Sequence, residues 1–107
     1  MKIEIITNCL DLLTGFEHLT NNEKKDCFSS VIDTLGSYPK PQKKTDIQRA
    51  KTYQIASYLF VSTARNYCKL SIENFIKLDT GINVIQYNLE SALSILTDNQ
   101  NEPQAVK

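Results

Sequence analysis

The sequence has few of the residues that interrupt helices or build reactive sites. Its 107 residues include three Gly, three Pro, three Cys, one His and no Trp. The scarcity of Gly and Pro permits long helices over most of the chain. The single His18 excludes metal sites that need several imidazoles, and a lone His is more typical of a surface residue than of a catalytic base.

The cysteines are too few and too scattered for a disulfide framework. Cys9, Cys27 and Cys68 are odd in number, far apart in sequence and flanked by apolar residues. That pattern is typical of reduced thiols that pack in a core. We expect these thiols to be dispensable for function.

Motifs of catalysis are also missing. The sequence contains no glycine-rich phosphate loop, no G-x-S-x-G turn and no pair of acids in a known acid and base pattern. We therefore predict that the protein is not an enzyme and that it binds no cofactor and no metal.

Net charge and long hydrophobic runs are absent as well. Twelve basic residues balance twelve acidic ones, which removes any argument for general polyanion binding. The longest apolar stretches, such as residues 55–61, are far shorter than the roughly 20 residues that cross a bilayer. The acids among the first 20 residues do not fit a signal peptide. We expect a cytoplasmic protein that does not enter a membrane.

What the chain does have is enough apolar side chains for one core. Ile, Leu, Val and Phe account for 30 of the 107 residues, above the level of about 20% below which disorder becomes the default. These residues recur at steps of three and four, the period of one-sided helices. We predict an all-α, single-domain bundle of four or five helices over residues 1–97, followed by a polar, frayed tail over residues 98–107.

Caps and breakers predict two helices in the first half. Apolar positions from Ile5 to Leu19 indicate a first helix. Residues 20–22 offer cap candidates for a second helix, and Gly36 is placed to end it. Two prolines within residues 37–44 then break the chain.

A long helix is predicted next, over about residues 46–69. It begins at a capping box in residues 45–48. Its apolar residues cover most of its circumference, so we expect it to be the central helix, with Leu59 buried. Ser71 then caps a short helix, residues 79–81 form a turn, and a last helix starts at Ile82.

Charge is unevenly distributed along the chain. Residues 1–37 carry three bases and six acids, residues 38–78 carry eight and two, and residues 79–107 carry one and four. Either these charges compensate one another in the folded domain, or the basic middle segment contacts an anionic partner.

One side of the long helix carries a row of polar side chains, which we name the polar stripe. Its members follow at steps of three and four residues and so share one narrow face: Lys51, Gln54, Tyr58, Ser62, Arg65 and Lys69. The polar stripe is either the ordinary solvated side of an amphipathic helix or a partner-binding face. On the second interpretation Tyr58 and Arg65 are its strongest residues, because Tyr and Arg often dominate interface energetics.

The predicted short helix, turn and last helix within residues 70–96 also match the segment lengths of a helix-turn-helix. Residues 54–59 and 70–72 resemble pieces of the DNA-binding domain of the bacterial replication initiator, which implies DNA binding. That family's basic, His-containing turn is absent here. The recognition helix of this arrangement, residues 82–96, contains no Lys or Arg, the residues on which phosphate and guanine contacts rely.

These observations favour a small non-enzymatic module that acts by occupying a partner protein. Immunity proteins, anti-defence inhibitors and small adaptors of bacteria or phages work in this way, and a toxin or a defence component would then be the partner. A helix-turn-helix regulator of transcription or replication that binds nucleic acid is the alternative. A third interpretation is a structural subunit whose apolar faces become buried when copies of the chain self-associate.

Overall fold

The chain folds into a helical bundle. A computed structural model describes residues 2–41 and 52–100. Its elements are α1 (Lys2–Leu12), the short 3₁₀ helix η1 (Phe16–His18), α2 (Asn21–Leu35), α3 (Thr52–Ile72) and α4 (Leu78–Gln100). The residues described contain no β-strand. The predicted all-α fold is therefore confirmed.

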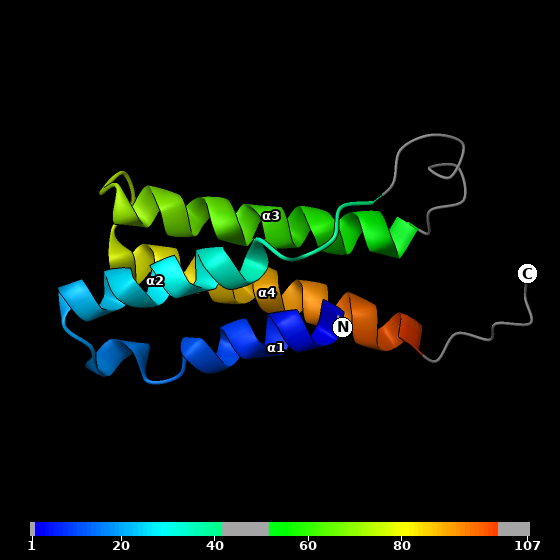
Figure 1. Cartoon of the computed structure of the whole chain (residues 1–107), viewed down its shortest axis with the longest axis horizontal. Helices are drawn as coiled ribbons and strands as arrows, with labels where there is room; N and C mark the ends of the chain where they lie inside the picture. Colours follow the sequence, from blue (N-terminus) through cyan, green and yellow to red (C-terminus); the bar gives the residue numbers. More distant parts are fainter. Residues whose placement is uncertain (1, 42–51, 101–107) are drawn as a thin grey trace, which may run out of the picture.

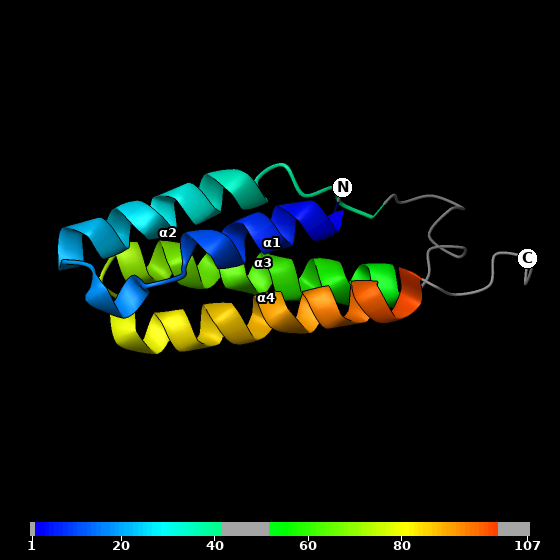
Figure 2. The same ribbon diagram turned by 90° about the horizontal axis from the view of Figure 1, so that it is seen from below.

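Successive helices run in opposite directions and close into a ring (Figure 1). α1 packs against α2, α2 against α3, α3 against α4, and α4 back against α1. The contact between α3 and α4 is the most extensive. These two helices have 21 and 23 residues, whereas α1 and α2 have 11 and 15. At 1.5 Å per residue, the start of α3 and the end of α4 extend past the shorter pair (Figure 2).

The core runs along the bundle axis and takes side chains from all four helices. Phe16 and Phe28 stack in it, with ring centroids 4.9 Å apart. The buried apolar residues are Ile5, Ile6, Cys9, Leu13, Phe16, Phe28, Val31, Leu35, Tyr38, Val61, Ala64, Cys68, Ile85, Leu89, Ala92 and Leu96. They form one continuous cluster.

The boundaries of α2 follow from local hydrogen bonds. The backbone N–H of Glu23 donates to Thr20 Oγ1 at 3.2 Å, and the Glu23 carboxylate accepts from the Thr20 N–H at 2.9 Å. This capping box satisfies amides that have no partner inside the helix. At the other end, the Gly36 N–H donates to the Ile32 carbonyl at 3.0 Å. The predicted cap within residues 20–22 and the predicted end at Gly36 are confirmed.

The first helix is shorter than the apolar spacing predicts. α1 ends at Leu12, and Gly15 adopts a left-handed conformation with φ of 76° before η1 begins. Leu13 and Phe16 are nevertheless both buried. The turn between α1 and η1 places Phe16 in the core. The apolar residues of this segment therefore face the core on both sides of the turn.

The predicted short helix after Ser71 and the predicted turn at residues 79–81 are wrong. Ser71 lies buried in the last turn of α3, and residues 79–81 belong to the start of α4. α3 ends instead at Ile72, and Asn74, two residues later, adopts a left-handed φ of 70°. The Phe75 N–H then donates to the Leu70 carbonyl at 2.9 Å, as in a Schellman motif.

The long helix is one-sided rather than central. Its buried residues are Ser57, Val61, Ala64, Cys68 and Ser71, and these occupy a single stripe. Leu59 is 58% exposed, so its predicted burial is wrong. α2 and α4 each pack against all three other helices, whereas α3 packs mainly against α2 and α4.

Two predicted features, the start of the long helix and the C-terminal tail, fall wholly or partly outside the described residues. The capping box at residues 45–48 and the start of the long helix before Thr52 lie outside the described residues. Residues 98–100, predicted to be part of the tail, belong to α4; the remainder of the predicted tail lies outside the described residues.

Candidate functional site

Two members of the polar stripe contact other parts of the chain. Arg65 Nε donates to the Ile32 carbonyl at 3.2 Å, at the C-terminal turn of α2. The Tyr58 ring stacks against Tyr38, with centroids 6.5 Å apart. Both side chains are half-buried. A partner that used Tyr58 or Arg65 would have to share or break these contacts.

The other members of the polar stripe differ in exposure. Gln54 and Ser62 are half-buried, Lys69 is exposed, and Lys51 lies outside the described residues. The five described members all lie in α3, where their spacing places them along one flank. Arg65 contacts α2 itself, and Tyr58 contacts the segment that follows it. Their role in binding a partner stays a prediction.

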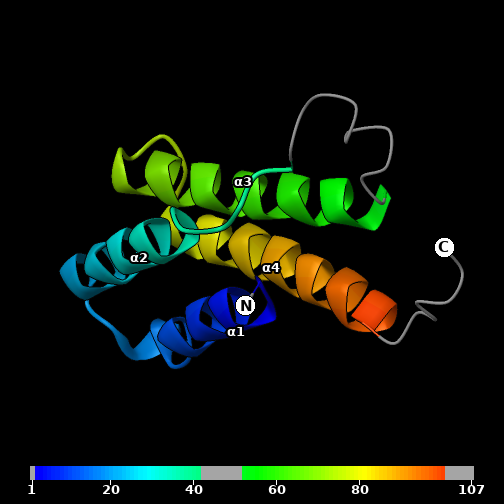
Figure 3. The same ribbon diagram turned by 45° about the vertical axis from the view of Figure 1, so that its right-hand side comes forward.

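Tyr38 anchors the segment that follows α2, which runs across to α3 (Figure 3). Its buried hydroxyl donates to Ser57 Oγ at 3.1 Å, and Ser57 Oγ donates to the Gln54 carbonyl at 3.1 Å. Burial raises the pKa of Tyr38, and the Ser57 hydrogen bond partly opposes this shift. This flank of α3 therefore has a structural role.

The opposite flank of α3 and the adjoining flank of α4 form a second face, which we name the outer α3–α4 face. Three of its large side chains are well exposed: Ile55 by 37%, Leu59 by 58% and Tyr87 by 64%. Exposed apolar side chains that gather on one face mark interaction sites more often than isolated ones do. The outer α3–α4 face comprises Ile55, Ala56, Leu59, Phe60 and Thr63 of α3, and Tyr87, Asn88, Glu90, Ser91, Ser94 and Ile95 of α4.

Two adjoining hollows lie on this face. The first has a volume of about 300 Å³ and is lined by Ala56, Leu59, Phe60, Thr63 and Asn88. The second has a volume of about 390 Å³ and is lined by Phe60, Tyr87, Glu90, Ser91, Ser94 and Ile95. Both are lined by Phe60, so they lie next to each other along the α3–α4 pair, and we refer to the two hollows together as the groove.

The charge beside this groove is acidic. Glu90 lines the groove, and Asp98 follows on the same side of α4 about two turns later. α4 contains Asp79, Glu90 and Asp98 and no Lys or Arg. The bases that the structure describes in α3, Arg65 and Lys69, lie on the flank of the polar stripe.

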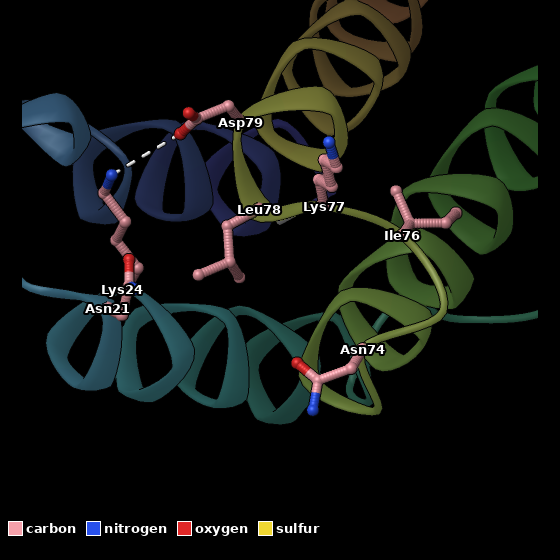
Figure 4. Close-up of a pocket in the computed structure, with 7 residues that line it drawn as sticks. All are labelled: Asn21, Lys24, Asn74, Ile76, Lys77, Leu78 and Asp79. Atoms are coloured by element: carbon pink, nitrogen blue, oxygen red, sulfur yellow. Dashed lines mark hydrogen bonds and ion pairs between the residues drawn. The ribbon is translucent and has the colours of Figure 1, made fainter.

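A polar hollow of about 290 Å³ lies at the end of the bundle where α2 and α4 begin (Figure 4). Lys24 Nζ approaches Asp79 Oδ1 at 3.5 Å across it and lies 5.2 Å from the centroid of the Phe16 ring. Asp79 is in the first turn of α4, where a negative charge complements the helix dipole. The pair links α2 to α4, and an ion pair with one exposed partner contributes about 0 to 1 kcal/mol.

The thiols are free and buried to different degrees. Cys9 and Cys68 are fully buried, and Cys27 is half-buried with its Sγ 3.0 Å from the Leu12 carbonyl. Burial raises the pKa of both Cys9 and Cys68 to about 12. The thiolate is the reactive form of cysteine, so neither thiol is activated at neutral pH.

Within residues 2–41 and 52–100, no group of three or more His, Cys, Asp or Glu side chains is arranged to hold a metal ion. None of the described helices is both long enough and apolar enough to span a membrane.

Comparison with known proteins gives no relative from which a function could be transferred. No protein-family model matches the chain, and neither the curated proteins nor the solved structures contain a significant match. The functional argument therefore rests on the geometry of this chain alone.

The outer α3–α4 face is the feature that the sequence analysis missed. Its apolar residues on α3, such as Leu59 and Phe60, contribute to the apolar positions that cover most of the circumference of the long helix, and that coverage predicted a central helix. A second signal was available in α4, whose Tyr87 and Ile95 fall off the stripe formed by Ile85, Leu89 and Leu96.

Proposed function

We propose that this protein is a small non-enzymatic module that acts by occupying a partner protein, and that the partner docks on the outer α3–α4 face. The observation that carries the proposal is the groove with exposed Leu59 and Tyr87 beside it. Apolar side chains that are exposed together around a hollow are a common feature of protein-binding surfaces.

The free energy gained by burying apolar side chains favours this face over the polar stripe as the binding surface. Association costs several kcal/mol in lost translational and rotational freedom, so a binding surface needs several anchors. Full burial of one large apolar side chain contributes about 1.5 to 3 kcal/mol. Leu59 and Tyr87 are each more than half exposed and can supply a large part of this, and Ile55 and Phe60 can add smaller amounts. Arg65, in contrast, already donates its Nε hydrogen bond to Ile32.

The proposed setting is the cytoplasm of a bacterial or phage-infected cell. A compact module without its own chemistry suits an immunity protein, an anti-defence inhibitor or an adaptor. In each of these roles the bound module covers the surface that a toxin or defence component needs.

A capture experiment with matched variants tests the proposal. The tagged protein, Leu59→Ser and Leu12→Ser are incubated with lysate of the source cells, with and without nuclease. Leu12 is a suitable control because it is 42% exposed on α1, away from the outer α3–α4 face. Circular dichroism melts establish that all three are folded.

We expect a protein partner that survives nuclease, is retained by Leu12→Ser and is lost with Leu59→Ser. Equal capture by Leu59→Ser would contradict the assignment of the face. Captured material that disappears after nuclease would favour the nucleic-acid alternative.

A further inference from the structure

We infer that the outer α3–α4 face receives a basic amphipathic helix of the partner protein. This inference rests on the proposed function and specifies the element that binds. It depends on three properties of the face: its backbone, its side chains and its charge.

The backbone of the face favours a helical occupant. α3 and α4 pair their backbone N–H and C=O groups within their own helices, so the face offers no sheet edge to an extended peptide. An extended segment buried there would leave its own backbone groups without partners, whereas a helix satisfies them internally. The groove between two antiparallel helices is a surface into which a third helix can pack.

The side chains of the groove suit close helix packing. Ala56, Ser91 and Ser94 are small and let a neighbouring backbone approach. Leu59 and Tyr87 are more than half exposed and provide apolar contact area. An occupant with an apolar stripe would cover these side chains and fill the two hollows.

The charge of the face favours a basic occupant. Glu90 lines the groove, Asp98 follows it on α4, and α4 provides no base to compensate them. Lys and Arg on either side of an apolar stripe would complement this charge. A second copy of the chain would instead bring its own Glu90 and Asp98 against the same acids, so like charges disfavour symmetric self-association through this face.

Two designed peptides test the inference with the full-length protein. Both are helical, about 18 residues long, and carry the same stripe of Leu at helical spacing; one has Lys at every polar position and the other has Glu. Binding is followed by fluorescence anisotropy at about 50 and about 300 mM salt. The variants are Leu59→Ser, Leu12→Ser and Glu90→Lys.

We expect the Lys peptide to bind about tenfold or more tightly than the Glu peptide at low salt, with a smaller ratio at high salt. Leu59→Ser should weaken the binding of the Lys peptide about tenfold, and Leu12→Ser should leave it within about twofold. Glu90→Lys should reduce or reverse the preference for the Lys peptide.

Three results would overturn the inference, and each is distinct from failure of the proposed function. Equal affinity for the two peptides, with both sensitive to Leu59→Ser, would remove the charge argument. Failure of both peptides to bind, while lysate capture still depends on Leu59, would exclude a simple helical occupant. A dimer in sedimentation analysis that Leu59→Ser dissociates would make a second copy the occupant.

Discussion

Leu59 and Leu89 carry the same side chain on neighbouring helices but in opposite surroundings. Leu59 is 58% exposed, whereas Leu89 is fully buried. Leu89→Ala should lower the free energy of unfolding by about 2 to 5 kcal/mol, because it leaves a cavity in the core. Leu59→Ala should change it by about 0.5 kcal/mol or less. Urea denaturation measures both, and a large loss at Leu59 would place that residue in the core.

Ser71 of α3 lies directly against Gly81 of α4. Ser71 Oγ is buried without a hydrogen-bond partner among the described residues. A Cβ added to Gly81 would overlap Ser71 Oγ and lie 3.4 Å from Ser71 Cβ. Gly81 is therefore required here by the neighbouring side chain, although glycine lowers helix propensity.

A double-mutant cycle tests this contact. Ser71→Ala alone should leave stability unchanged or raise it, because it removes an unpaired buried hydroxyl. Gly81→Ala alone should lower stability by about 1 to 3 kcal/mol through overpacking. In the Ser71→Ala background the same Gly81 change should be nearly neutral or stabilising, and additive effects would contradict the geometry.

Hydropathy at single positions predicted the core better than it predicted the groove. Ile85, Leu89 and Leu96 lie on the predicted inner stripe of the last helix and are buried. By residue type alone, Phe60 and Tyr87 cannot be distinguished from core residues. They lie on the outer α3–α4 face because of the way α3 and α4 pack against each other. The hydropathy of a single position does not report that packing.

At the scale of elements, the ends of α2 were predictable because the interactions that set them are local. Thr20 and Glu23 are three residues apart, and their reciprocal hydrogen bonds depend only on that spacing. The end of α3 was missed because Ser71 offered a plausible cap in the sequence. In the structure Ser71 lies inside α3 and packs against Gly81 of α4, and α3 ends at Ile72, just before the left-handed Asn74.

Arg65 joins two elements and provides a prediction about stability. Its Nε donates to the Ile32 carbonyl at the C-terminal turn of α2, where a positive charge also complements the helix dipole. Arg65→Glu should lower the free energy of unfolding by about 1 kcal/mol or more, because it removes the donor and places a negative charge there. Lys69→Glu, four residues later and exposed, is the matched control and should cost less. Equal losses in thermal melts would deny Arg65 this role.

For the whole molecule, the buried thiols predict a loss of stability at alkaline pH. The pKa of Cys9 and of Cys68 is raised by burial from 9.0 to about 12. Between pH 9 and 12 the unfolded chain therefore releases protons that the folded chain retains, and the free energy of unfolding falls as pH rises. The fall should reach about 1.4 kcal/mol per pH unit for each thiol, with the full contribution present below pH 9.

Urea denaturation from pH 7 to pH 11 checks this dependence. Stability should be insensitive to these thiols below pH 9 and should decline above it. Cys68→Ala should show a shallower decline than the parent protein, whatever its stability at pH 7. The same slope in both proteins would show that Cys68 is not protected from ionisation by the fold.

The lengths of the helices connect the fold of the molecule to its proposed role. α3 and α4 are longer than α1 and α2, and their outer flanks retain apolar side chains that no other described element covers. Hydrogen exchange of the protein alone and in complex with its captured partner tests this account most directly. We predict that protection on binding concentrates in residues 56–63 of α3 and 87–95 of α4, while α2 is unaffected. Protection centred on Arg65, Lys69 and the C-terminal turn of α2, with residues 87–95 unchanged, would contradict the account and assign binding to the polar stripe.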